Sequence, residues 1–519
     1  MVALRSVAAV TALAAAAVTT ALASCTPADP PFVLAASTSA RTAGGAISER
    51  FAGLSLEWSL VESYMDPAVR AQLVNMLDSL GGGMLRIGGA SQDLMPFVGV
   101  APNSRRVVTR ADLQSVRSTL DGAPGWQAIL GTTMTPRTAE RPWASPGHAR
   151  RFIDQGVRPA FAGAEKRVAG IELGNEPDLT YRDDVSRYVR DVRRYVHHSA
   201  PFPAIVGSTS EAIAPWRTLD AGGSDLRYFW RWDGILNAAA PVVRRSGGWA
   251  ADHFYPTKRD CSDDPYRCSS ITRLLSQGRM DNLAYQTYVH ARQARAHGLD
   301  YRMEEMNSAA GRGVAGVSDT AASALWALVA MFTAACPQPP HQPRANADCR
   351  IGATGVNVHC AEADEIFLAG GGNASYNPIT FGPHRLRAMP EYYALLLFAR
   401  FAQGTRALRP VVTGVRALHG WTVDANDGSR RVFLVNTGAR AATTSLATAA
   451  GTHEIDRLRG DSRTSRHVSI DGRTLATDGT WPGFAPARAA VTGGRLTVHV
   501  AEAEAAVVTL RPRLDVDFG

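Results

Sequence analysis

The chain lacks the features that mark most nucleic-acid-binding and metal-binding proteins. Its 519 residues carry a formal net charge of +8, but the basic residues, almost all of them arginines, are scattered along the chain. Nucleic-acid binders usually concentrate such charge and interleave it with aromatic residues. Metal-ligand spacing is also absent, because His197 and His198 lie in a basic segment and no Cys-x-x-Cys or His-x-x-x-His pattern accompanies them. We therefore expect neither a nucleic-acid partner nor a structural metal.

Cysteine is scarce, with six residues in the chain. The first, Cys25, ends the run Leu-Ala-Ser-Cys after a charge-free, alanine-rich segment that follows Arg5. These properties predict that residues 1–24 are a signal peptide. The run is similar to a bacterial lipoprotein cleavage box, whose cysteine receives the lipid; the alternative is ordinary secretory cleavage before an incidental cysteine. Either alternative predicts export, and residues 25–45 are then a tether followed by the first strand of a β-domain.

The other five cysteines are expected to form two disulfides, as is usual in exported proteins. Cys261 and Cys268 flank the short loop Ser-Asp-Asp-Pro-Tyr-Arg, and Cys336 and Cys349 flank a proline-rich insert. This pairing leaves Cys360 without a partner.

The hydrophobic pattern predicts two domains. Strand-like and helical runs alternate as an α/β barrel of eight strands requires, with strands over residues 51–58, 84–89, 126–133, 168–173, 204–210, 249–255, 301–307 and 354–359. A helix over residues 383–404 ends this region. Short alternating strands separated by Gly, Asp and Asn turns follow. We predict a (β/α)8 TIM barrel over residues 46–404 and a C-terminal antiparallel β-sandwich over residues 405–519, in which the few aromatic residues argue against sugar binding.

Two carboxylates lie at the ends of predicted barrel strands. The strand over 168–173 stops at Gly-Asn-Glu-Pro, where Pro177 is expected to hold Glu176 extended at the mouth of the barrel. The alternative is that Glu176 caps the next helix. The run over 301–308 contains Glu304 and Glu305, of which only one can face the mouth, since adjacent strand residues face opposite sides. Two such carboxyls suit glycoside hydrolysis, in which one protonates the leaving oxygen and the other attacks the anomeric carbon.

Four segments of the chain carry specific motifs. They are LRIGGASQD near the start, GIELGNEPD around Glu176, EMNS with the later GVSDTAASALWAL around Glu305, and ASYNPITFGP near the end. Together they resemble glycoside hydrolase family 79, the β-glucuronidase and heparanase-like family, over roughly residues 45–410. The resemblance implies that Glu176 is the acid/base on strand four and Glu305 the nucleophile on strand seven. It leaves Glu304 as an outward-facing neighbour.

The resemblance also implies a set of substrate-binding residues. Asp93 matches a position that binds sugar hydroxyls, and Asn175 is expected to meet the sugar 2-hydroxyl. Gly311, Arg312 and Tyr376 match residues that contact the carboxylate of a uronic acid. Arg312 departs from the glycine seen in some relatives, so it either adds a charge to that site or points to solvent.

Further contacts are expected from other strand ends. Arg86 ends the second strand, where its guanidinium either holds Glu305 ionised or pairs with another carboxylate. Tyr255 is placed to donate to Glu305, and His253, two residues earlier, faces the same side and is expected to be a packed hydrogen-bonding residue. Glu172 lies deeper than the mouth and is expected to pair with an inward arginine.

The combined prediction is an exported retaining β-glucuronidase, either a cell-surface lipoprotein or secreted, that acts on a glucuronic-acid-containing glycoside or polysaccharide. It needs no cofactor and meets the membrane only through a lipid anchor. One alternative is a barrel glycosidase for a neutral sugar, such as a β-xylosidase, an arabinofuranosidase or a β-glucosidase. Another is a lipoprotein that binds polysaccharide without hydrolysing it.

Overall fold

The computed structural model describes most of the chain after the predicted tether. The described residues are 32–34, 45–98, 107–139, 141–182, 184–209, 232–262, 264–338, 348–363, 372–382, 384–411, 413–448 and 451–511. The predicted signal peptide, residues 1–24, and Cys25 lie outside them. Among the described residues, no helix has both the length and the apolar character needed to cross a membrane.

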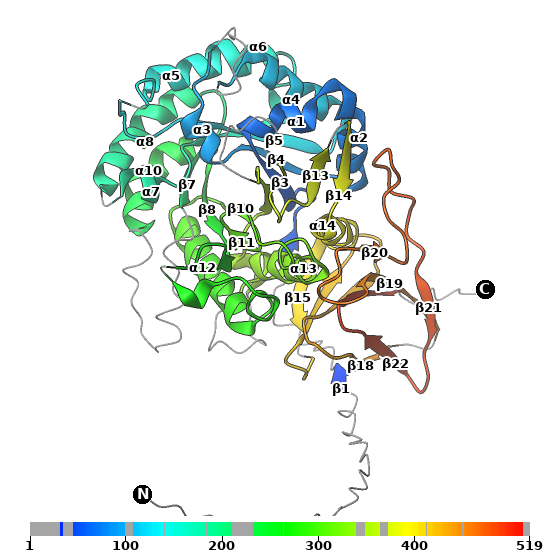
Figure 1. The fold of residues 1–519 in the computed structure, drawn as a ribbon. Coiled ribbons are helices and arrows are strands. Elements are labelled where there is room, and N and C mark those ends of the chain that lie inside the picture. Colours follow the sequence, from blue (N-terminus) through cyan, green and yellow to red (C-terminus); the bar gives the residue numbers. More distant parts are fainter. Residues whose placement is uncertain are drawn as a thin grey trace, which may run out of the picture. The chain divides into compact units, whose positions relative to one another are not determined.

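Eight parallel strands close into the predicted barrel (Figure 1). The order around it is β10, β12, β3, β4, β5, β6, β7 and β8. The strands are β3 (Ala52–Glu57), β4 (Gly83–Gly88), β5 (Trp126–Thr132), β6 (Val168–Leu173), β7 (Ala204–Thr209), β8 (Trp249–Phe254), β10 (Tyr301–Met306) and β12 (Val356–Cys360). All eight predicted strands are therefore confirmed, and none of their ends is displaced by more than two residues.

Helices follow the strands and cover the outside of the barrel (Figure 1). Local signals start them: the Asp66 side chain accepts a hydrogen bond from the Ala68 amide at the start of α2, and Thr109 and Asp112 form a capping box at the start of α4. The helices are α1 (Val61–Met65), α2 (Pro67–Ser79), α3 (Ala90–Leu94), α4 (Arg110–Gly122), α5 (Pro146–Arg151), α6 (Arg158–Ala160), α7 (Pro177–Tyr181), α8 (Val185–Ser199), α10 (Trp232–Arg245), α11 (Ile271–Leu274), α12 (Gln277–Ala296), α13 (Ala321–Ala335) and α14 (Pro390–Phe401).

The helix predicted over residues 383–404 is wrong in its first part. A hairpin of β13 (Ile379–Gly382) and β14 (Arg385–Ala388) precedes α14, which begins at Pro390. In β14 the exposed arginines 385 and 387 flank the buried Leu386, which is the period of a strand. Proline at the first helical position then marks the true start of the helix.

Two sheets form the predicted β-sandwich. The larger has the order β2 (Gly45–Ile47), β15 (Thr405–Val411), β16 (Leu418–Asp424), β17 (Arg430–Asn436), β23 (Glu504–Leu510), β19 (Thr452–Gly460) and β20 (Val468–Ile470), with β21 (Ala487–Ala490) paired to β19. The smaller has the order β1 (Phe32–Leu34), β18 (Ala442–Ala447) and β22 (Arg495–Val500). A strand before the barrel is thus present in each sheet, since β1 pairs with β18 and β2 with β15.

Helices α13 and α14 pack between the barrel and the larger sheet. Every residue of α13 is buried, which explains its apolar character all round. Phe332 of α13 stacks on Trp421 of β16 at 4.6 Å between ring centroids and touches Phe433 of β17 at 4.7 Å. The sandwich therefore supports the side of the barrel that carries β10 and β12, the strands before and after α13.

Candidate active site

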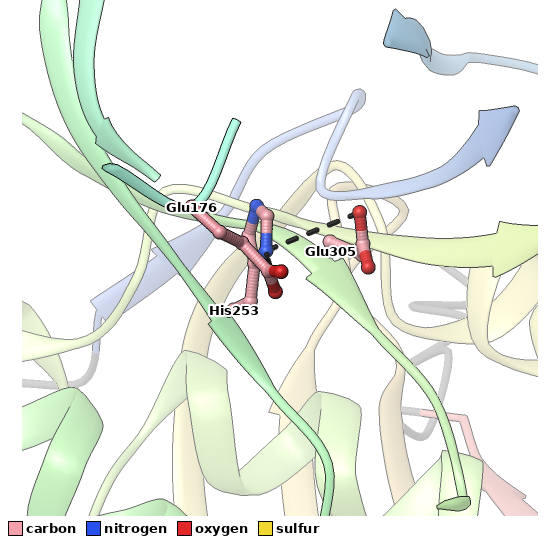
Figure 2. Close-up of side chains that lie close together, drawn as sticks. All are labelled: Glu176, His253 and Glu305. Carbon is pink, nitrogen blue, oxygen red and sulfur yellow. Dashed lines mark hydrogen bonds and ion pairs between the residues drawn. The ribbon is translucent and has the colours of Figure 1, made fainter. Parts of the chain in front are cut away.

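Glu176 lies at the carboxyl end of β6, at the mouth of the barrel (Figure 2). The extended conformation predicted from Pro177 is wrong: Glu176 is left-handed, with φ 43° and ψ 61°. It occupies the N-cap position of α7, but its side chain makes no capping hydrogen bond. Instead its carboxylate lies 3.1 Å from Nδ1 of His253 on β8, and its side chain is 22% exposed. The strained backbone thus turns the carboxylate inward toward β8.

Glu305 lies on β10 and is held from both sides. Arg86 donates to its Oε2 at 2.6 Å, and the Tyr255 hydroxyl donates to its Oε1 at 2.6 Å. Nδ1 of His253 is 3.9 Å from Oε2, and Nδ1 of His359 is 3.8 Å from it. The contacts predicted for Arg86 and Tyr255 are therefore present.

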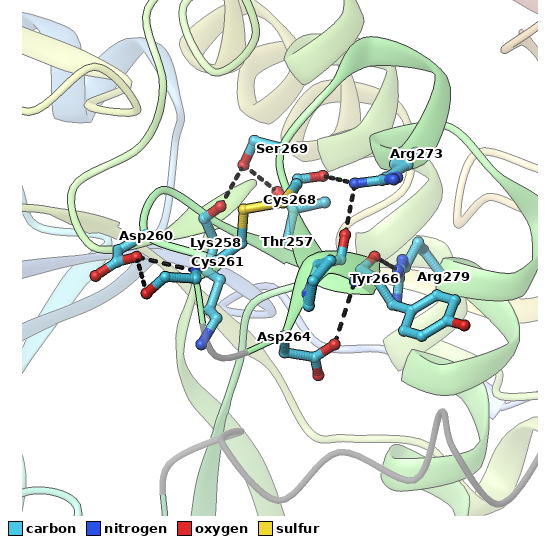
Figure 3. Close-up of a disulfide and its surroundings, with 12 residues drawn as sticks. Thr257, Lys258, Asp260, Cys261, Asp264, Tyr266, Cys268, Ser269, Arg273 and Arg279 are labelled. Atoms are coloured by element: carbon cyan, nitrogen blue, oxygen red, sulfur yellow. Dashed lines mark hydrogen bonds between the residues drawn. A yellow bond between two sulfur atoms is a disulfide. The ribbon is translucent and has the colours of Figure 1, made fainter.

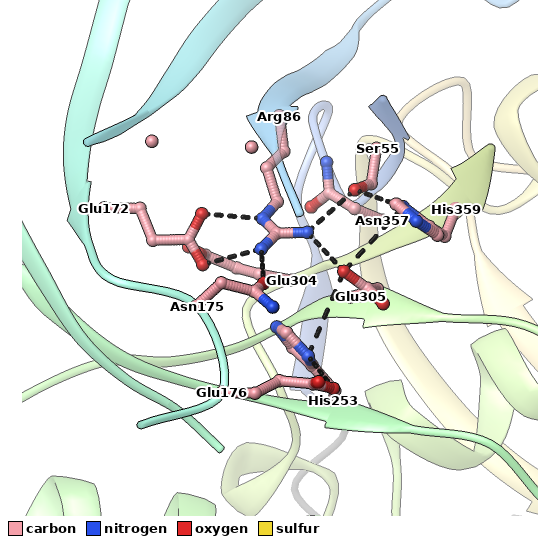
Figure 4. Close-up of polar contacts among 12 residues, drawn as sticks. Ser55, Arg86, Glu172, Asn175, Glu176, His253, Glu304, Glu305, Asn357 and His359 are labelled. Carbon is pink, nitrogen blue, oxygen red and sulfur yellow. Dashed lines mark hydrogen bonds and ion pairs between the residues drawn. The ribbon is translucent and has the colours of Figure 1, made fainter. Parts of the chain in front are cut away.

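The prediction that Glu304 faces outward is wrong. Glu304 is fully buried and accepts a hydrogen bond from Nε1 of Trp249, and it lies beside Glu172 and Arg86 (Figure 4). The register of β10 shifts between Met303 and Glu305 against β8. Such a bulge interrupts strict alternation, so both glutamates point into the barrel, Glu305 at the mouth and Glu304 below it.

Arg86 joins the mouth to the barrel interior (Figure 4). It is fully buried and binds both oxygens of Glu172, at 2.7 and 2.9 Å. It also donates to Oδ1 of Asn175 at 2.8 Å and to Oγ of Ser55 at 2.9 Å. Both alternatives predicted for Arg86 are therefore correct, since it pairs with Glu305 and also with Glu172. Glu172 is the buried structural group that was predicted.

Three site residues were not predicted from the sequence: Ser55, Glu57 and His359. Nδ1 of His359 lies 2.9 Å from Oγ of Ser55, and its Nε2 lies 3.5 Å from Glu57. Glu57 in turn accepts hydrogen bonds from the backbone amides of Ala90 and Ser91. Glu57 and His359 each lie within one residue of the end of a predicted strand, and this was the available signal, because the carboxyl ends of all eight strands meet at one face. Ser55 lies three residues before the predicted end of its strand and gave no such signal.

Charges around the two glutamates make them electrostatically different. Burial alone would raise the pKa of Glu305, but His359, His253 and Arg86 outweigh it and hold that pKa well below its ordinary value. Burial opposes the charged form of His253, yet Glu305 and the hydrogen bond to Glu176 raise its pKa to about 9. Glu305 is therefore an ionised carboxylate at neutral pH.

Asp93 has a structural role in addition to the predicted contact with sugar hydroxyls, which stays a prediction. It lies in α3 and is 4% exposed. Its two carboxylate oxygens accept hydrogen bonds from the backbone amides of Met134, at 3.1 Å, and Asn175, at 3.0 Å. Burial, only partly offset by these hydrogen bonds, raises its pKa to about 7. In this structure Asp93 orients the segment that carries Asn175 and Glu176.

The predicted carboxylate-binding residues come together beside Tyr255. Gly311, Arg312 and Gly313 are all left-handed, with φ of 76°, 72° and 73°. The Ser375 amide donates to the Arg312 carbonyl at 3.0 Å, and a side chain at Gly313 would meet the Tyr376 amide at 2.8 Å. The ring of Tyr376 lies 6.2 Å from that of Tyr255. The glycines thus allow a tight turn against Tyr376, while Arg312 occupies a conformation that favours glycine.

A disulfide-linked loop supports this turn (Figure 3). A disulfide joins Cys261 to Cys268. Just before this loop, β9 (Thr257–Lys258) pairs with β11 (Ala309–Ala310), the strand that leads into the turn. Arg267 is buried and donates to the Tyr255 carbonyl at 3.0 Å. The loop therefore fixes the backbone of a residue that contacts Glu305.

The remaining cysteines follow the predicted pattern. Cys336 and Cys349 form the second disulfide, and Cys360 is a buried free thiol.

One group of described residues has the composition of a metal site. The carboxylates of Glu176 and Glu305 and a ring nitrogen of His253 lie within 4.8 Å of one another (Figure 2). The Arg86 guanidinium already forms an ion pair with Oε2 of Glu305. That cation would repel a metal ion at the same oxygen, so the group fits a pair of reacting carboxylates better than a metal centre.

The buried ionisable groups predict how stability depends on pH. Burial, reinforced by Glu172, raises the pKa of Glu304 to about 8, and the pKa of His253 is about 9. Because the folded state then holds these protons more tightly, stability falls as pH rises from about 4.3 to 8 for Glu304 and from about 6.5 to 9 for His253. The depressed pKa of Glu305 acts oppositely, stabilising the fold above about pH 4.3. From these groups we expect the unfolding temperature to decline as pH rises from about 5 to 9.

Thermal unfolding of the wild type and of Glu304→Gln across this range checks the prediction. The variant has no proton to lose at that position, so its decline between pH 5 and 8 should be shallower. An equal decline in the two proteins would show that Glu304 does not carry the effect.

The fold is shared with solved glycosidase structures, whereas no protein-family model and no curated protein matches the sequence. A 4-O-α-L-rhamnosyl-β-D-glucuronidase from Fusarium oxysporum has 18% identity and a TM-score of 0.65, covering 90% of this chain and 97% of that chain. A family 51 arabinofuranosidase from Xanthomonas axonopodis has 14% identity and a TM-score of 0.60, covering 90% and 97%. A β-xylosidase from Caulobacter crescentus has 14% identity and a TM-score of 0.55, covering 91% and 98%. The chain therefore has the (β/α)8 barrel and β-sandwich fold of these glycoside hydrolases.

Proposed function

We propose that the protein is a retaining glycoside hydrolase that releases β-linked glucuronic acid. The observation that carries the proposal is the approach of the two carboxylates, an oxygen of Glu176 lying within 4.8 Å of an oxygen of Glu305. Retaining enzymes hold their carboxyl groups about 5 to 5.5 Å apart, and inverting enzymes about 6.5 to 9.5 Å. The shorter spacing leaves no room for a water between the sugar and Glu305, so Glu305 attacks the sugar itself.

In the first step Glu305 attacks the anomeric carbon while Glu176 gives its proton to the departing oxygen. Arg86, Tyr255 and His359 keep Glu305 ionised and oriented for attack. In the second step Glu176 takes a proton from a water molecule while that water attacks the anomeric carbon. The bond between the sugar and Glu305 breaks, so Glu305 is again a free carboxylate and Glu176 is again protonated. His253 lies next to both carboxylates and stabilises whichever of them is negatively charged. The scheme needs no cofactor.

Asn175 fits the role of a sugar ligand. Arg86 holds its amide oxygen, so the amide NH2 is the group left to donate to a hydroxyl of the sugar. The Asp93 carboxylate fixes the Asn175 backbone from the other side. A donor oriented in this way can strengthen its hydrogen bond to the 2-hydroxyl in the transition state.

The preference for a uronic acid rests on the turn at residues 311–313 and on Tyr376. The Gly313 amide already donates to the Ala309 carbonyl at 3.1 Å, so the amides of Gly311 and Arg312 are the ones that a turn of this kind can offer to an anion. The Arg312 side chain is half-buried and adds a positive charge next to this turn. The likeness to a protein described as a glucuronidase supports the same substrate class.

Substrate charge is the first test. Charge-assisted hydrogen bonds to a carboxylate are each worth about 1.5 to 3 kcal/mol. An aryl β-glucuronide should therefore be hydrolysed far better than the corresponding glucoside or xyloside, which leave those donors poorly paired. Tyr376→Phe should lower kcat/KM for the glucuronide by about tenfold or more and barely change that for the glucoside.

The neutral-sugar alternative has its own support, because two of the solved structures are described as an arabinofuranosidase and a β-xylosidase. Hydrolysis of an aryl xyloside, arabinofuranoside or glucoside as fast as the glucuronide would establish that alternative.

We also propose that the protein is exported and anchored by a lipid on Cys25. Cys25→Ala should move the protein from the membrane fraction into the medium or leave the signal peptide uncleaved. Mass spectrometry of the mature N-terminus distinguishes lipidation of Cys25 from ordinary secretory cleavage, since an unmodified N-terminus at any other residue contradicts lipidation.

A further inference from the structure

The barrel-facing side of the larger sandwich sheet changes from apolar to polar beyond the end of α14. Phe433 and Val507 on β17 and β23 pack into the apolar core shared with the barrel helices. Two positions away on the same face, Arg431 and Thr509 stand opposite each other, and Thr509 also stands opposite Glu454 of β19. This polar row forms the floor of a cleft of about 480 Å³. A cleft of that size can hold one or two sugar residues.

Aromatic rings form one wall of the cleft. Phe401, the last residue of α14, and Phe484, in the loop before β21, meet edge to face with centroids 5.0 Å apart. The Arg431 guanidinium lies 5.6 Å from the Phe401 ring and donates to the Phe401 carbonyl at 3.0 Å. Apolar ring surface beside a fixed polar group suits a ligand with C–H faces and a polar edge.

Two residues that line the cleft each carry a buried polar atom with no hydrogen-bond partner among the described residues. The atoms are Oδ1 of Asp456, whose residue is 3% exposed, and Nε of Arg431. Burial and the neighbouring Asp471 raise the pKa of Asp456 to about 8, so its carboxyl is neutral at pH 7. A small rotation of these side chains into the cleft would present an unused acceptor and an unused donor, which together fit a hydroxyl group.

Most charges in the cleft already have partners. Arg431 lies 3.4 Å from Asp427, and Arg511 lies 3.1 Å from Glu454. A charged ligand would compete with these pairs, whereas a neutral ligand would leave them intact. Arg400, exposed at the end of α14, is the one further cation that lines the cleft in the part of the chain described.

We propose that this cleft is a second carbohydrate site, separate from the barrel mouth, that binds a neutral pyranose residue. The sugar lies with its C–H face toward Phe401 and Phe484, and one hydroxyl bridges Asp456 and Arg431. The site goes beyond the hydrolytic function and would hold a neutral part of a polysaccharide. Aromatic residues are few in the sandwich, but one of the two rings comes from the last helix of the barrel.

Binding of methyl β-D-xyloside and methyl β-D-glucoside, measured by NMR titration of the Glu305→Gln protein, tests the proposal. Asp456→Ala and Phe484→Ala should each lower the association constant by about tenfold. Asp456→Asn is the matched control: its amide can donate to Asp471 and keeps an acceptor oxygen, so binding should be retained. The same three substitutions in the otherwise wild-type enzyme should leave hydrolysis of an aryl glycoside unchanged.

The proposal is overturned if neither neutral glycoside binds, or if both alanine variants bind as well as their parent. It is also overturned if methyl β-D-glucuronide is the preferred ligand and its binding is the one lost in Asp456→Ala and Phe484→Ala. If the barrel were to take a neutral sugar, these glycosides would also bind at its mouth, so the evidence for the cleft is the loss of binding in Asp456→Ala and Phe484→Ala and not binding itself. Hydrolysis of the aryl glycosides tests the proposed function separately, so failure of the cleft and failure of the proposed function are distinguishable.

Discussion

Glu305→Ala is expected to lower kcat/KM for an aryl β-glucuronide by about 10⁴-fold or more, because it removes the atom that forms the bond to the sugar. Added azide should restore turnover and give the α-glucuronosyl azide, since the small anion enters from the face that Glu305 vacates. In Glu176→Ala azide should instead give the β-product, because the attack by Glu305 still takes place first.

Glu304→Gln is the matched control for this substitution. Glu304 is the adjacent residue on β10 and is fully buried below the mouth, with a raised pKa that favours its neutral form. A glutamine preserves that neutral form, so activity should stay close to wild type. Loss of activity in Glu304→Gln but not in Glu305→Ala would reverse the assignment of the two glutamates.

Arg86→Leu is expected to destabilise the fold by about 3 to 5 kcal/mol, the usual cost of removing one partner from a buried ion pair. The substitution leaves Glu172 and Glu305 without their common cation, and neither carboxylate can reach solvent easily, with residue exposures of 0% and 6%. Chemical denaturation of the two proteins measures the difference in the free energy of unfolding.

Arg117→Leu provides the control for Arg86. Arg117 pairs with Asp121 on the surface of α4, where the side chains are 25% and 51% exposed. A solvated pair of this kind contributes about 0 to 1 kcal/mol. If Arg86→Leu were no more destabilising than Arg117→Leu, the buried network would not be a source of stability.

The sequence predicted the barrel well because buried parallel strands form continuous apolar runs that periodicity detects. It also predicted which strand ends would meet, so Arg86, Tyr255 and Glu305 were brought together correctly. The two errors at the site concern backbone geometry. A bulge in β10 and a left-handed Glu176 depend on tertiary packing, whereas alternation and the effect of Pro177 are local rules.

Side chains that act through other residues were harder to predict. Ser55 shares β3 with Glu57, and His359 shares β12 with Asn357, but nothing in either strand indicates that Ser55 and His359 meet. Asp93 also accepts hydrogen bonds from the backbone amides of Met134 and Asn175, which the sequence does not indicate, and its contact with a sugar stays a prediction. The cleft beside α14 joins segments between residues 400 and 511, and composition alone cannot show that they converge.

The central claim is that Glu176 and Glu305 cleave a β-glycoside by two successive displacements. Proton NMR of the first minutes of aryl β-glucuronide hydrolysis tests it directly, because the anomer released first is recorded before mutarotation. The β-anomer of glucuronic acid should appear first and the α-anomer only later. Initial release of the α-anomer would contradict attack by Glu305 and show that water displaces the leaving group in one step.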